Sequence, residues 1–272
     1  MPTIKNYLSL VKFSHTVFAM PFALIGFALA VRYGTPIKLL FQNPFEFHVN
    51  GQVMHGLNPA LKFYLKIFVL IIVCMVTARS AAMAFNRYLD RNFDAKNPRT
   101  ALREIPRGII SSPHALRFVI INCILFIIAT FFINKICFYL SPLALFVVLF
   151  YSYTKRFTPL CHLVLGMGLS LAPIGAYLAV TGEFAWLPLL FSFSVIFWVS
   201  GFDIIYALQD EDFDRENKLF SIPSAVGKKN ALSISSLLHV LSAICVIFAG
   251  WYGGFGWLYW IGVTVFTGIL IY

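Results

Sequence analysis

Residues 79–107 of the 272-residue chain read RSAAMAFNRYLDRNFDAKNPRTALREIPR, which begins inside an apolar run and ends in a segment crowded with charge. Asn86, Asp90 and Asp94 repeat at a spacing of four, and Arg79 lies seven residues before Asn86. On an α-helix these intervals keep the four side chains near one face. Three basic residues follow at the same interval, namely Arg99, Arg103 and Arg107. Acidic groups at a helix end, facing a basic loop, are what a metal-bridged diphosphate would need.

A second acidic stretch repeats this pattern at residues 203–214, DIIYALQDEDFD. Helical spacing places Asp203, Tyr206, Asp210 and Asp214 on one face. The two stretches and the segments beside them hold nine of the 11 acidic residues, because only Glu46 and Glu183 lie elsewhere. A single D-x-x-x-D pair is often just a solvated helix end. Two such pairs, which hold nearly all the acid in an apolar chain, predict a functional site.

The composition is that of an integral membrane protein. Hydrophobic residues make up 60% of the chain and charged residues 12%, with a mean hydropathy of +0.81, whereas soluble domains carry about 25% charged residues. Apolar runs of about 20 residues predict helices rather than a barrel. We therefore expect an all-α membrane protein, one domain over residues 1–272, with eight transmembrane helices. Their expected ranges are 10–32, 63–87, 113–133, 136–154, 160–181, 185–207, 230–250 and 254–272.

The net charge of +10 is better explained by topology than by nucleic-acid binding. Most of the 21 Lys and Arg residues fall on the side that holds the N-terminus and the segments 86–117, 155–156 and 215–229. Positive charge marks the cytoplasmic side, so both acidic stretches are expected there, in a bacterial-type inner membrane. They end the second and sixth spans, a repeat that suggests two pseudo-equivalent four-helix halves around a shared central cavity.

Carboxylates at a membrane boundary are costly unless they are paired or metal-bound. Mg²⁺ is the natural partner, since it takes one or two carboxylates together with substrate phosphates. Nearby basic side chains are placed to neutralise the remaining phosphate charge: Arg99, Arg103, Lys155, Arg156 and Lys218. A calcium EF-hand is excluded because the acids keep helical spacing and lack the loop glycine. The five cysteines are scattered singly, which argues against a zinc site or a disulfide framework.

These motifs resemble those of the UbiA-type intramembrane aromatic prenyltransferases, closest to the bacterial 4-hydroxybenzoate polyprenyltransferase-like branch. The resemblance rests on Asn86-Arg87-x-x-Asp90-x-x-x-Asp94, Asn97-Pro98-Arg99-Thr100 and Asp203-x-x-Tyr206-Ala207-x-x-Asp210-x-x-x-Asp214. Two further stretches look like family signatures, Lys12-Phe13-Ser14-His15-Thr16-Val17-Phe18-Ala19 and Lys155-Arg156-Phe157-Thr158. The resemblance implies a helix bundle with a lateral opening to lipid. Family members usually have nine spans, so a ninth is expected beyond Tyr272. Ser152 stands where many members have a proline before the Lys-Arg pair, a difference that concerns the local geometry and not the chemistry.

The resemblance also implies a role for each matching residue. The Mg²⁺ ligands would be Asn86, Asp90, Asp94, Asp210 and Asp214. The diphosphate contacts would be Asn86, Arg99, Arg103, Lys155, Arg156 and Lys218. Asp203 and Tyr206 would stabilise an allylic cation or remove the ring proton. Arg79 would bind the carboxylate of the acceptor or pair with Asp203. Lys12 and His15 are weaker candidates for acceptor binding, since Lys12 also suits the interface and His15 also suits packing.

The function implied is Mg²⁺-dependent transfer of a polyprenyl group from polyprenyl diphosphate to a ring carbon of an aromatic acid in quinone biosynthesis. The first acceptor is 4-hydroxybenzoate, for ubiquinone, and the alternative is a dihydroxynaphthoate, for menaquinone. A cation-coupled secondary transporter remains as a different class, although its carboxylates are expected near the membrane midplane. A CDP-alcohol phosphotransferase is disfavoured because the D-G-x-x-A-R opening of that family is missing.

Overall fold

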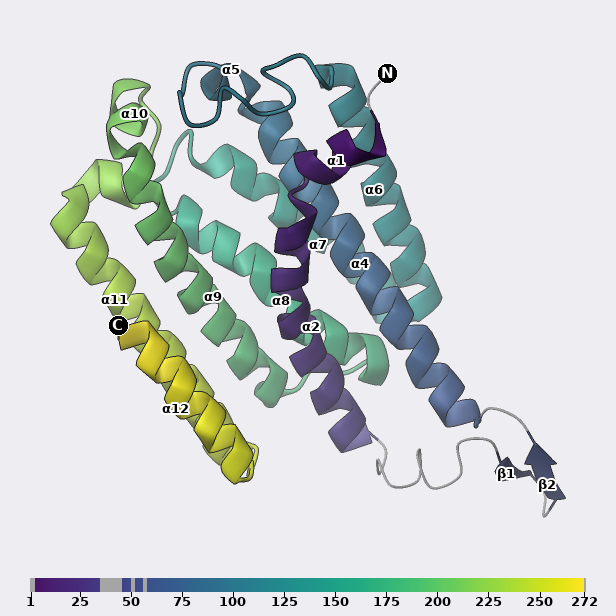
Figure 1. The fold of residues 1–272 in the computed structure, drawn as a ribbon. Coiled ribbons are helices and arrows are strands. Elements are labelled where there is room, and N and C mark those ends of the chain that lie inside the picture. Colours follow the sequence, from purple (N-terminus) through teal and green to yellow (C-terminus); the bar gives the residue numbers. More distant parts are fainter. Residues whose placement is uncertain (1–2, 35–45, 50–51, 56–57, 272) are drawn as a thin grey trace.

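The computed structural model describes residues 3–34, 46–49, 52–55 and 58–271. Long helices run side by side along one axis (Figure 1). In chain order the elements are α1 (Ile4–Leu10), α2 (Phe13–Gly34), β1 (Glu46–Val49), β2 (Gln52–His55), α4 (Pro59–Leu89), α5 (Arg91–Asp94), α6 (Ser112–Ile133), α7 (Lys135–Thr154), α8 (Cys161–Thr181), α9 (Trp186–Ala207), η1 (Leu208–Asp210), α10 (Glu211–Glu216), α11 (Ile222–Tyr252) and α12 (Trp257–Ile271).

Each of the eight expected spans coincides with a helix, namely α2, α4, α6, α7, α8, α9, α11 or α12. Six of these, all except α2 and α12, are long and apolar enough to cross a membrane. The apolar parts of α2 and α12 that were assessed are shorter, Ala19–Tyr33 and Trp257–Leu270. The chain is thus a multi-pass α-helical membrane protein, and the count of eight spans stays a prediction. The antiparallel pair β1–β2 is a small addition to the all-α expectation.

Local sequence signals explain where the main helices begin and end. Asn58 accepts a hydrogen bond from the amide of Ala60 and precedes Pro59, so it caps α4. Asn134 caps α7 in the same way. Ser221 and Ser224 form a reciprocal capping box at the start of α11. Gly182, with a φ of 71°, ends α8 in the left-handed conformation that glycine adopts at little cost.

The bundle is held by close helix contacts. The most extensive pairings join α9 with α11 and α8, α4 with α6, and α2 with α8. At the α8–α9 crossing, a Cβ on Gly166 would lie 2.5 Å from Ser200 Oγ and 2.6 Å from the carbonyl oxygen of Ile196. Only a residue without a side chain allows the backbones to approach this closely. The division into two four-helix halves stays a prediction. In that division α2 and α4 belong to the first half and α8 to the second, yet α2 packs more extensively on α8 than on α4.

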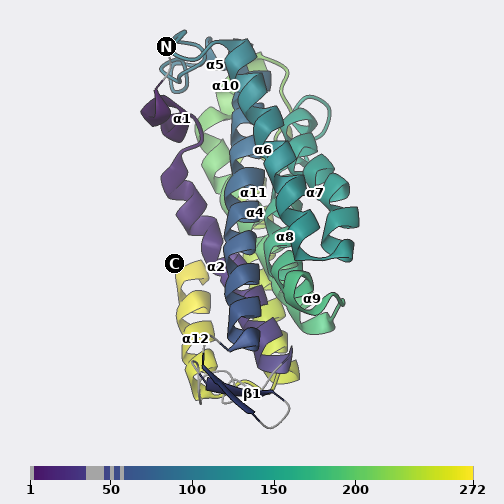
Figure 2. The same cartoon turned by 90° about the vertical axis from the view of Figure 1, so that its right-hand side faces the viewer.

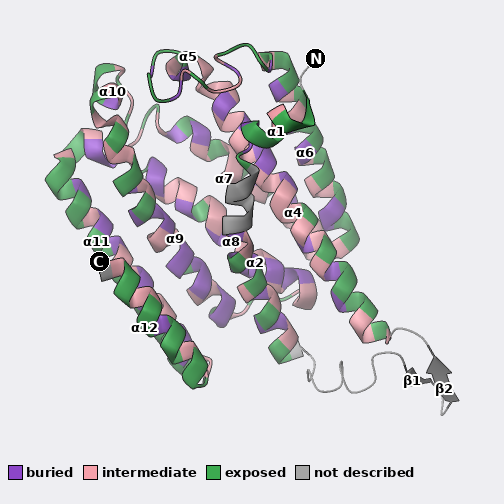
Figure 3. Cartoon of the chain, viewed as in Figure 1, coloured by how far each residue is buried: buried purple, intermediate pink, exposed green. Residues whose placement is uncertain are grey.

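The outer surface of the bundle is apolar, as a bilayer requires. Large hydrophobic side chains such as Phe131, Tyr139 and Trp257 are more than half exposed, and exposed residues follow the outward faces of α6 and α12 (Figure 3). The polar elements instead gather at the ends. Figure 2 shows α1, α5 and α10 at one end of the bundle and β1 at the other. The end that carries α5 and α10 holds the acidic stretches.

Candidate active site

The structure brings the two acidic stretches together at one end of the bundle. The segment after α5 folds across to the junction of α9 and α10 (Figure 1). There Asn97 Nδ2 donates to Asp210 Oδ1 at 3.0 Å. Arg99 forms a forked pair with the same carboxylate, with Nε 3.0 Å from Oδ1 and Nη2 in contact with Oδ2. Direct contacts therefore link the two acidic stretches.

The first stretch keeps its helical spacing with a small break. Helix α4 ends at Leu89, Asp90 is its C-cap, and α5 begins at Arg91. The amide of Asp94 still donates to the carbonyl of Asp90 at 2.7 Å, so the chain continues as a helical turn. Asn86 Nδ2 donates to Asp90 Oδ2 at 3.1 Å, which places these two side chains together. Burial raises the pKa of Asp90 above its ordinary value.

The second stretch is not one uninterrupted helix. Helix α9 ends at Ala207, a single 3₁₀ turn covers Leu208–Asp210, and α10 begins at Glu211. The tighter turn breaks the strict spacing of four, yet Tyr206 and Asp210 still meet one partner. Arg99 Nη1 donates to Tyr206 Oη at 3.0 Å, and its guanidinium lies 5.3 Å from the centre of the Tyr206 ring.

Each of the four predicted metal-binding carboxylates has a basic partner, and each partner is a predicted diphosphate contact. The pairs are Asp90–Arg156 at 3.3 Å, Asp94–Arg103 at 2.8 Å, Asp210–Arg99, and Asp214–Lys155 at 2.7 Å. The cations are the outer layer of the cluster, with side chains 25–36% exposed against 0–25% for the carboxylates. Hydrogen bonding to Asp210 and its negative charge raise the pKa of Arg99 above its ordinary value.

The oxygen donors of this cluster suit Mg²⁺. Within residues 3–34, 46–49, 52–55 and 58–271, no three His, Cys, Asp or Glu side chains gather closely enough to hold an ion alone. Mg²⁺ does not require such a cage, because it binds one or two carboxylates and completes its shell with water and substrate phosphates. Asp90 with Asn86 offers one such set, and Asp210 with Asp214 offers another. The residues present therefore fit the ion.

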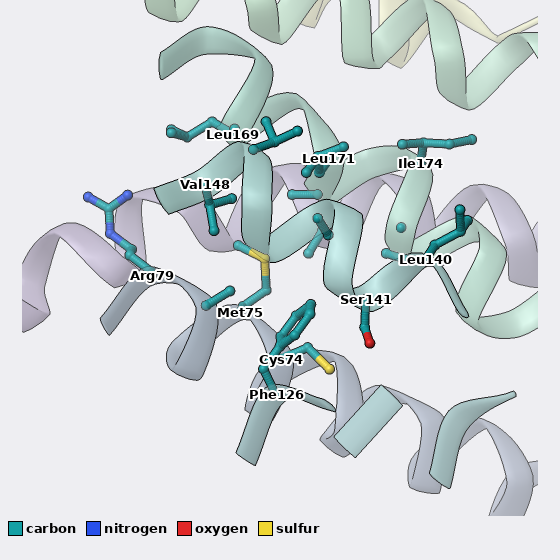
Figure 4. A pocket seen from close by; sticks show the side chains of 18 of the residues that line it. Cys74, Met75, Arg79, Phe126, Leu140, Ser141, Val148, Leu169, Leu171 and Ile174 are labelled. Carbon is teal, nitrogen blue, oxygen red and sulfur yellow. The ribbon is translucent and has the colours of Figure 1, made fainter. Parts of the chain in front are cut away.

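A cavity of about 440 Å³ lies between α2, α4, α6, α7 and α8. Its walls are almost wholly apolar, and Arg79 is the one charged side chain among its lining residues. Figure 4 shows Arg79 at one end of this view, away from Ser141 and Phe126. Tyr151 also lines the cavity and lies near Asp90, Asp203 and Arg79, so the cavity approaches the acidic cluster.

One predicted alternative is wrong. Asp203 pairs with His162, with Oδ2 2.7 Å from Nδ1, rather than with Arg79. In the described part of the chain no ion pair of Arg79 is present, and its Nε has no hydrogen-bond partner. Arg79 lies in the cavity wall, and its role in binding the carboxylate of the acceptor stays a prediction.

The remaining predicted residues are less tied to the cluster. Lys218 and Lys12 are exposed, have left-handed backbones with φ of 55° and 42°, and show no ion pair within the described ranges. His15 lies on α2, but its side chain is outside the described residues, so its role stays a prediction.

Sequence reasoning missed several residues that build the site. His162 holds Asp203, and Asn97 bridges to Asp210 although it was seen only as part of a motif. Glu104 contacts both Arg87 and Ser9, which ties the segment after α5 to α4 and α1. A lone histidine on an apolar helix and a glutamate amid arginines gave no separate signal. Only the fold shows which partners they meet.

Comparisons with known proteins identify the family. The sequence profile of the UbiA prenyltransferase family matches residues 55–272. The chain is 31% identical over 195 residues to the 4-hydroxybenzoate octaprenyltransferase of Tolumonas auensis, covering 71% of this chain and 68% of that protein. It is 29% identical over 242 residues to the enzyme of the same name from Actinobacillus pleuropneumoniae, covering 87% of this chain and 79% of that one.

Solved structures agree with this assignment. The apo structure of a UbiA homolog from Aeropyrum pernix superposes with a TM-score of 0.79 at 30% identity, covering 95% of this chain and 86% of that one. A UbiA homolog from Archaeoglobus fulgidus bound to DMAPP and Mg²⁺ shares the fold, with a TM-score of 0.72 at 18% identity and coverage of 98% and 84%. The chain belongs to the UbiA prenyltransferase family and is a membrane-embedded prenyltransferase.

Proposed function

We propose that this enzyme transfers a polyprenyl group from polyprenyl diphosphate to a ring carbon of 4-hydroxybenzoate in quinone biosynthesis, with Mg²⁺ as its metal. The observation that carries the proposal is the cluster of four carboxylate–cation pairs beside an apolar cavity whose wall holds Arg79. A diphosphate needs cations and metal ligands, a prenyl chain needs apolar walls, and a small acid needs one positive group. The relatives named 4-hydroxybenzoate octaprenyltransferase support this choice of acceptor.

The diphosphate binds by an exchange of partners. Arg99, Arg103, Lys155 and Arg156 turn from their carboxylates to the phosphate oxygens, with Asn86 and Lys218 as further contacts. Asp90, Asp94, Asp210 and Asp214, with Asn86, are thereby freed to hold the metal. Bound Mg²⁺ supplies positive charge that stabilises the diphosphate as a leaving group. The forked donors of the arginines stabilise the same charge, since guanidinium matches phosphate geometry.

The reacting carbon and the ring meet below the diphosphate. Apolar walls accommodate the prenyl chain and exclude water, while Arg79 binds the carboxylate of the acceptor, with Lys12 and His15 as secondary candidates. Asp203 and Tyr206 lie within two helical turns of Asp210, and their oxygens stabilise the positive charge or accept the ring proton. Before the diphosphate binds, Arg99 donates to the phenol Oη of Tyr206.

We propose that the cluster faces the cytoplasmic side of a bacterial inner membrane, and the excess of Lys and Arg at this end supports this by the positive-inside rule. On that side of the membrane, 4-hydroxybenzoate arrives from the aqueous phase and polyprenyl diphosphate arrives from the bilayer. Spans at α2 and α12 complete a count of eight.

A membrane assay with radiolabelled polyprenyl diphosphate and 4-hydroxybenzoate tests the proposal, with Mg²⁺ or with EDTA. We expect a prenylated product that disappears with EDTA and in Asp90→Ala, but persists in Asp212→Ala, which removes an exposed acid of α10. Product only with a dihydroxynaphthoate would replace the acceptor and direct the pathway to menaquinone. No product with either acid, from folded protein, would overturn the proposal and favour ion transport.

A further inference from the structure

His162 is buried at a point where three helices meet. It is the second residue of α8, its relative exposure is 2%, and it contacts both α9 and the first residue of α11. An imidazole at such a depth has two ring nitrogens to satisfy. Both have partners here, and those partners decide where the ring proton lies.

The two hydrogen bonds assign the tautomer of the ring in its neutral form. The backbone N–H of Ile222 donates to Nε2 of His162 at 3.3 Å. An N–H donor can approach only an unprotonated nitrogen, so Nε2 accepts and the proton of the neutral ring is on Nδ1. That Nδ1–H then donates to Oδ2 of Asp203 at 2.7 Å. The imidazole of His162 thus donates to the carboxylate of Asp203, and the backbone N–H of Ile222 at the start of α11 orients the opposite side of the ring.

The surrounding packing holds α8 and α9 close together beside this contact. Ser200 Oγ donates to the carbonyl of His162 at 3.1 Å, and Ser200 lies one turn before Asp203 on α9. One turn after His162, Gly166 lets α8 approach α9 so closely that an added Cβ would meet Ser200. The close approach of the α8 and α9 backbones therefore sets the distance between His162 on α8 and Asp203 on α9.

Asp203 is held by His162 on one side and is partly exposed on the other. Its side chain is 30% exposed, and the contact with His162 uses Oδ2. One turn further along α9, Tyr206 contacts Arg99, which holds Asp210. Tyr151, which lines the cavity together with Arg79, lies near Asp203. Asp203 thus lies one turn before Tyr206, which belongs to the charged cluster through Arg99.

We propose that His162 is a positioning residue, which holds Asp203 in the orientation that the reaction requires through a relay from the Ile222 amide. This inference rests on the proposed function, in which Asp203 acts on the allylic cation or the ring proton. His162 itself touches neither substrate. Losing it should lower kcat and leave the KM for prenyl diphosphate unchanged, because the diphosphate partners are other residues.

Two conservative variants separate the two hydrogen bonds. The amide nitrogen of Asn occupies a place close to Nδ1, so His162→Asn keeps a donor for Asp203 and loses the acceptor for Ile222. The amide of Gln reaches the place of Nε2, so His162→Gln keeps the acceptor and loses the donor. We expect kcat within about threefold of wild type for H162N and about 10- to 100-fold lower for H162Q, the size of a lost hydrogen bond to a charged group.

A double-mutant cycle decides the case in which both variants lose activity. If His162 acts through Asp203, then H162Q costs little further kcat once Asp203→Asn is present. Full activity in H162Q with loss in H162N would show that His162 serves only to anchor Ile222. Additive losses in the cycle would equally overturn the proposal.

An NMR measurement keeps this test separate from that of the proposed function. In ¹⁵N-histidine-labelled protein, we expect one of the six histidines to show a protonated Nδ1 and a free Nε2, and to vanish in H162N. A doubly protonated or Nε2-protonated ring would refute the relay even in an active enzyme. If wild type makes no product but the Nδ1–H signal is present and shifts in D203N, the proposed function fails and the relay stands.

Discussion

Replacing Arg99 by alanine should have opposite effects on two ligands. Arg99 contacts both oxygens of Asp210 and the hydroxyl of Tyr206. As long as that pair is closed, Asp210 is shared with a cation and is a poor metal ligand. When a diphosphate is present, the same guanidinium is proposed to bind phosphate oxygens. Arg99→Ala therefore frees the carboxylate for Mg²⁺ and removes a contact to the diphosphate.

The magnitudes follow from exposure and charge. The Arg99 side chain is 32% exposed, so the pair with Asp210 is screened by solvent and is worth about 1 kcal/mol. Its removal should tighten the binding of Mg²⁺ alone by about fivefold. A charge-assisted hydrogen bond to phosphate is worth about 1.5–3 kcal/mol. Binding of prenyl diphosphate with Mg²⁺ should therefore weaken by about 10- to 100-fold.

Calorimetric titration of the purified protein in detergent measures both affinities. Arg99→Lys keeps the charge without the fork, so we expect diphosphate affinity between those of wild type and R99A. The matched control is Arg215→Ala, which removes an exposed pair with Glu211 on α10 and should change neither affinity by more than about twofold. If R99A weakens Mg²⁺ and diphosphate equally, Arg99 only holds the loop, and the exchange of partners is wrong.

Three further variants test the fold and the cavity. Glu104→Gln should lower the free energy of unfolding by about 3 kcal/mol, because Arg87 then keeps a buried charge without its anion; an unchanged melting temperature in detergent would contradict this. Gly166→Ala should lower the free energy of unfolding by about 1–3 kcal/mol, because the added methyl group overpacks the α8–α9 crossing. Gly175→Ala is the control and should be close to neutral, because an added Cβ meets nothing within 4 Å there. Equal melting temperatures of the two variants would refute the close crossing. Arg79→Ala should raise the KM for the aromatic acid by about 10-fold or more and leave that for prenyl diphosphate unchanged, and kinetics with a reversed pattern would move Arg79 to the diphosphate site.

Much of the fold could be predicted from the sequence, because hydropathy and helical length act locally along the chain. All eight expected ranges overlap helices, and the acidic stretches do end α4 and α9. The spacing rule also predicted contacts within one turn, such as Asn86 with Asp90. Its failure at Leu208–Asp210 is local too, because the rule assumes an α-helix and the chain forms a 3₁₀ turn there.

Contacts between distant segments were beyond the sequence. Helical spacing says which side chains share a face, but not which neighbour that face meets. The partner of Asp203 depends on the α8–α9 crossing, which Gly166 permits, and so His162 replaced Arg79 as that partner. Residues 95–111 are held together with the rest of the fold by Asn97 and Arg99, which contact Asp210, and by Glu104, which contacts Arg87. A single sequence carries no local sign of these contacts.

The layering of the charged cluster implies an order of binding. The basic side chains lie outside and the carboxylates lie beneath them, so an approaching ligand meets positive charge first. This outer layer should repel a bare divalent cation, whereas it should attract a diphosphate, which would draw the basic groups outward. Each basic group that turns to phosphate leaves one carboxylate without a partner. The affinity for the metal should therefore rise only when diphosphate is present, and this coupling is reciprocal by thermodynamic necessity.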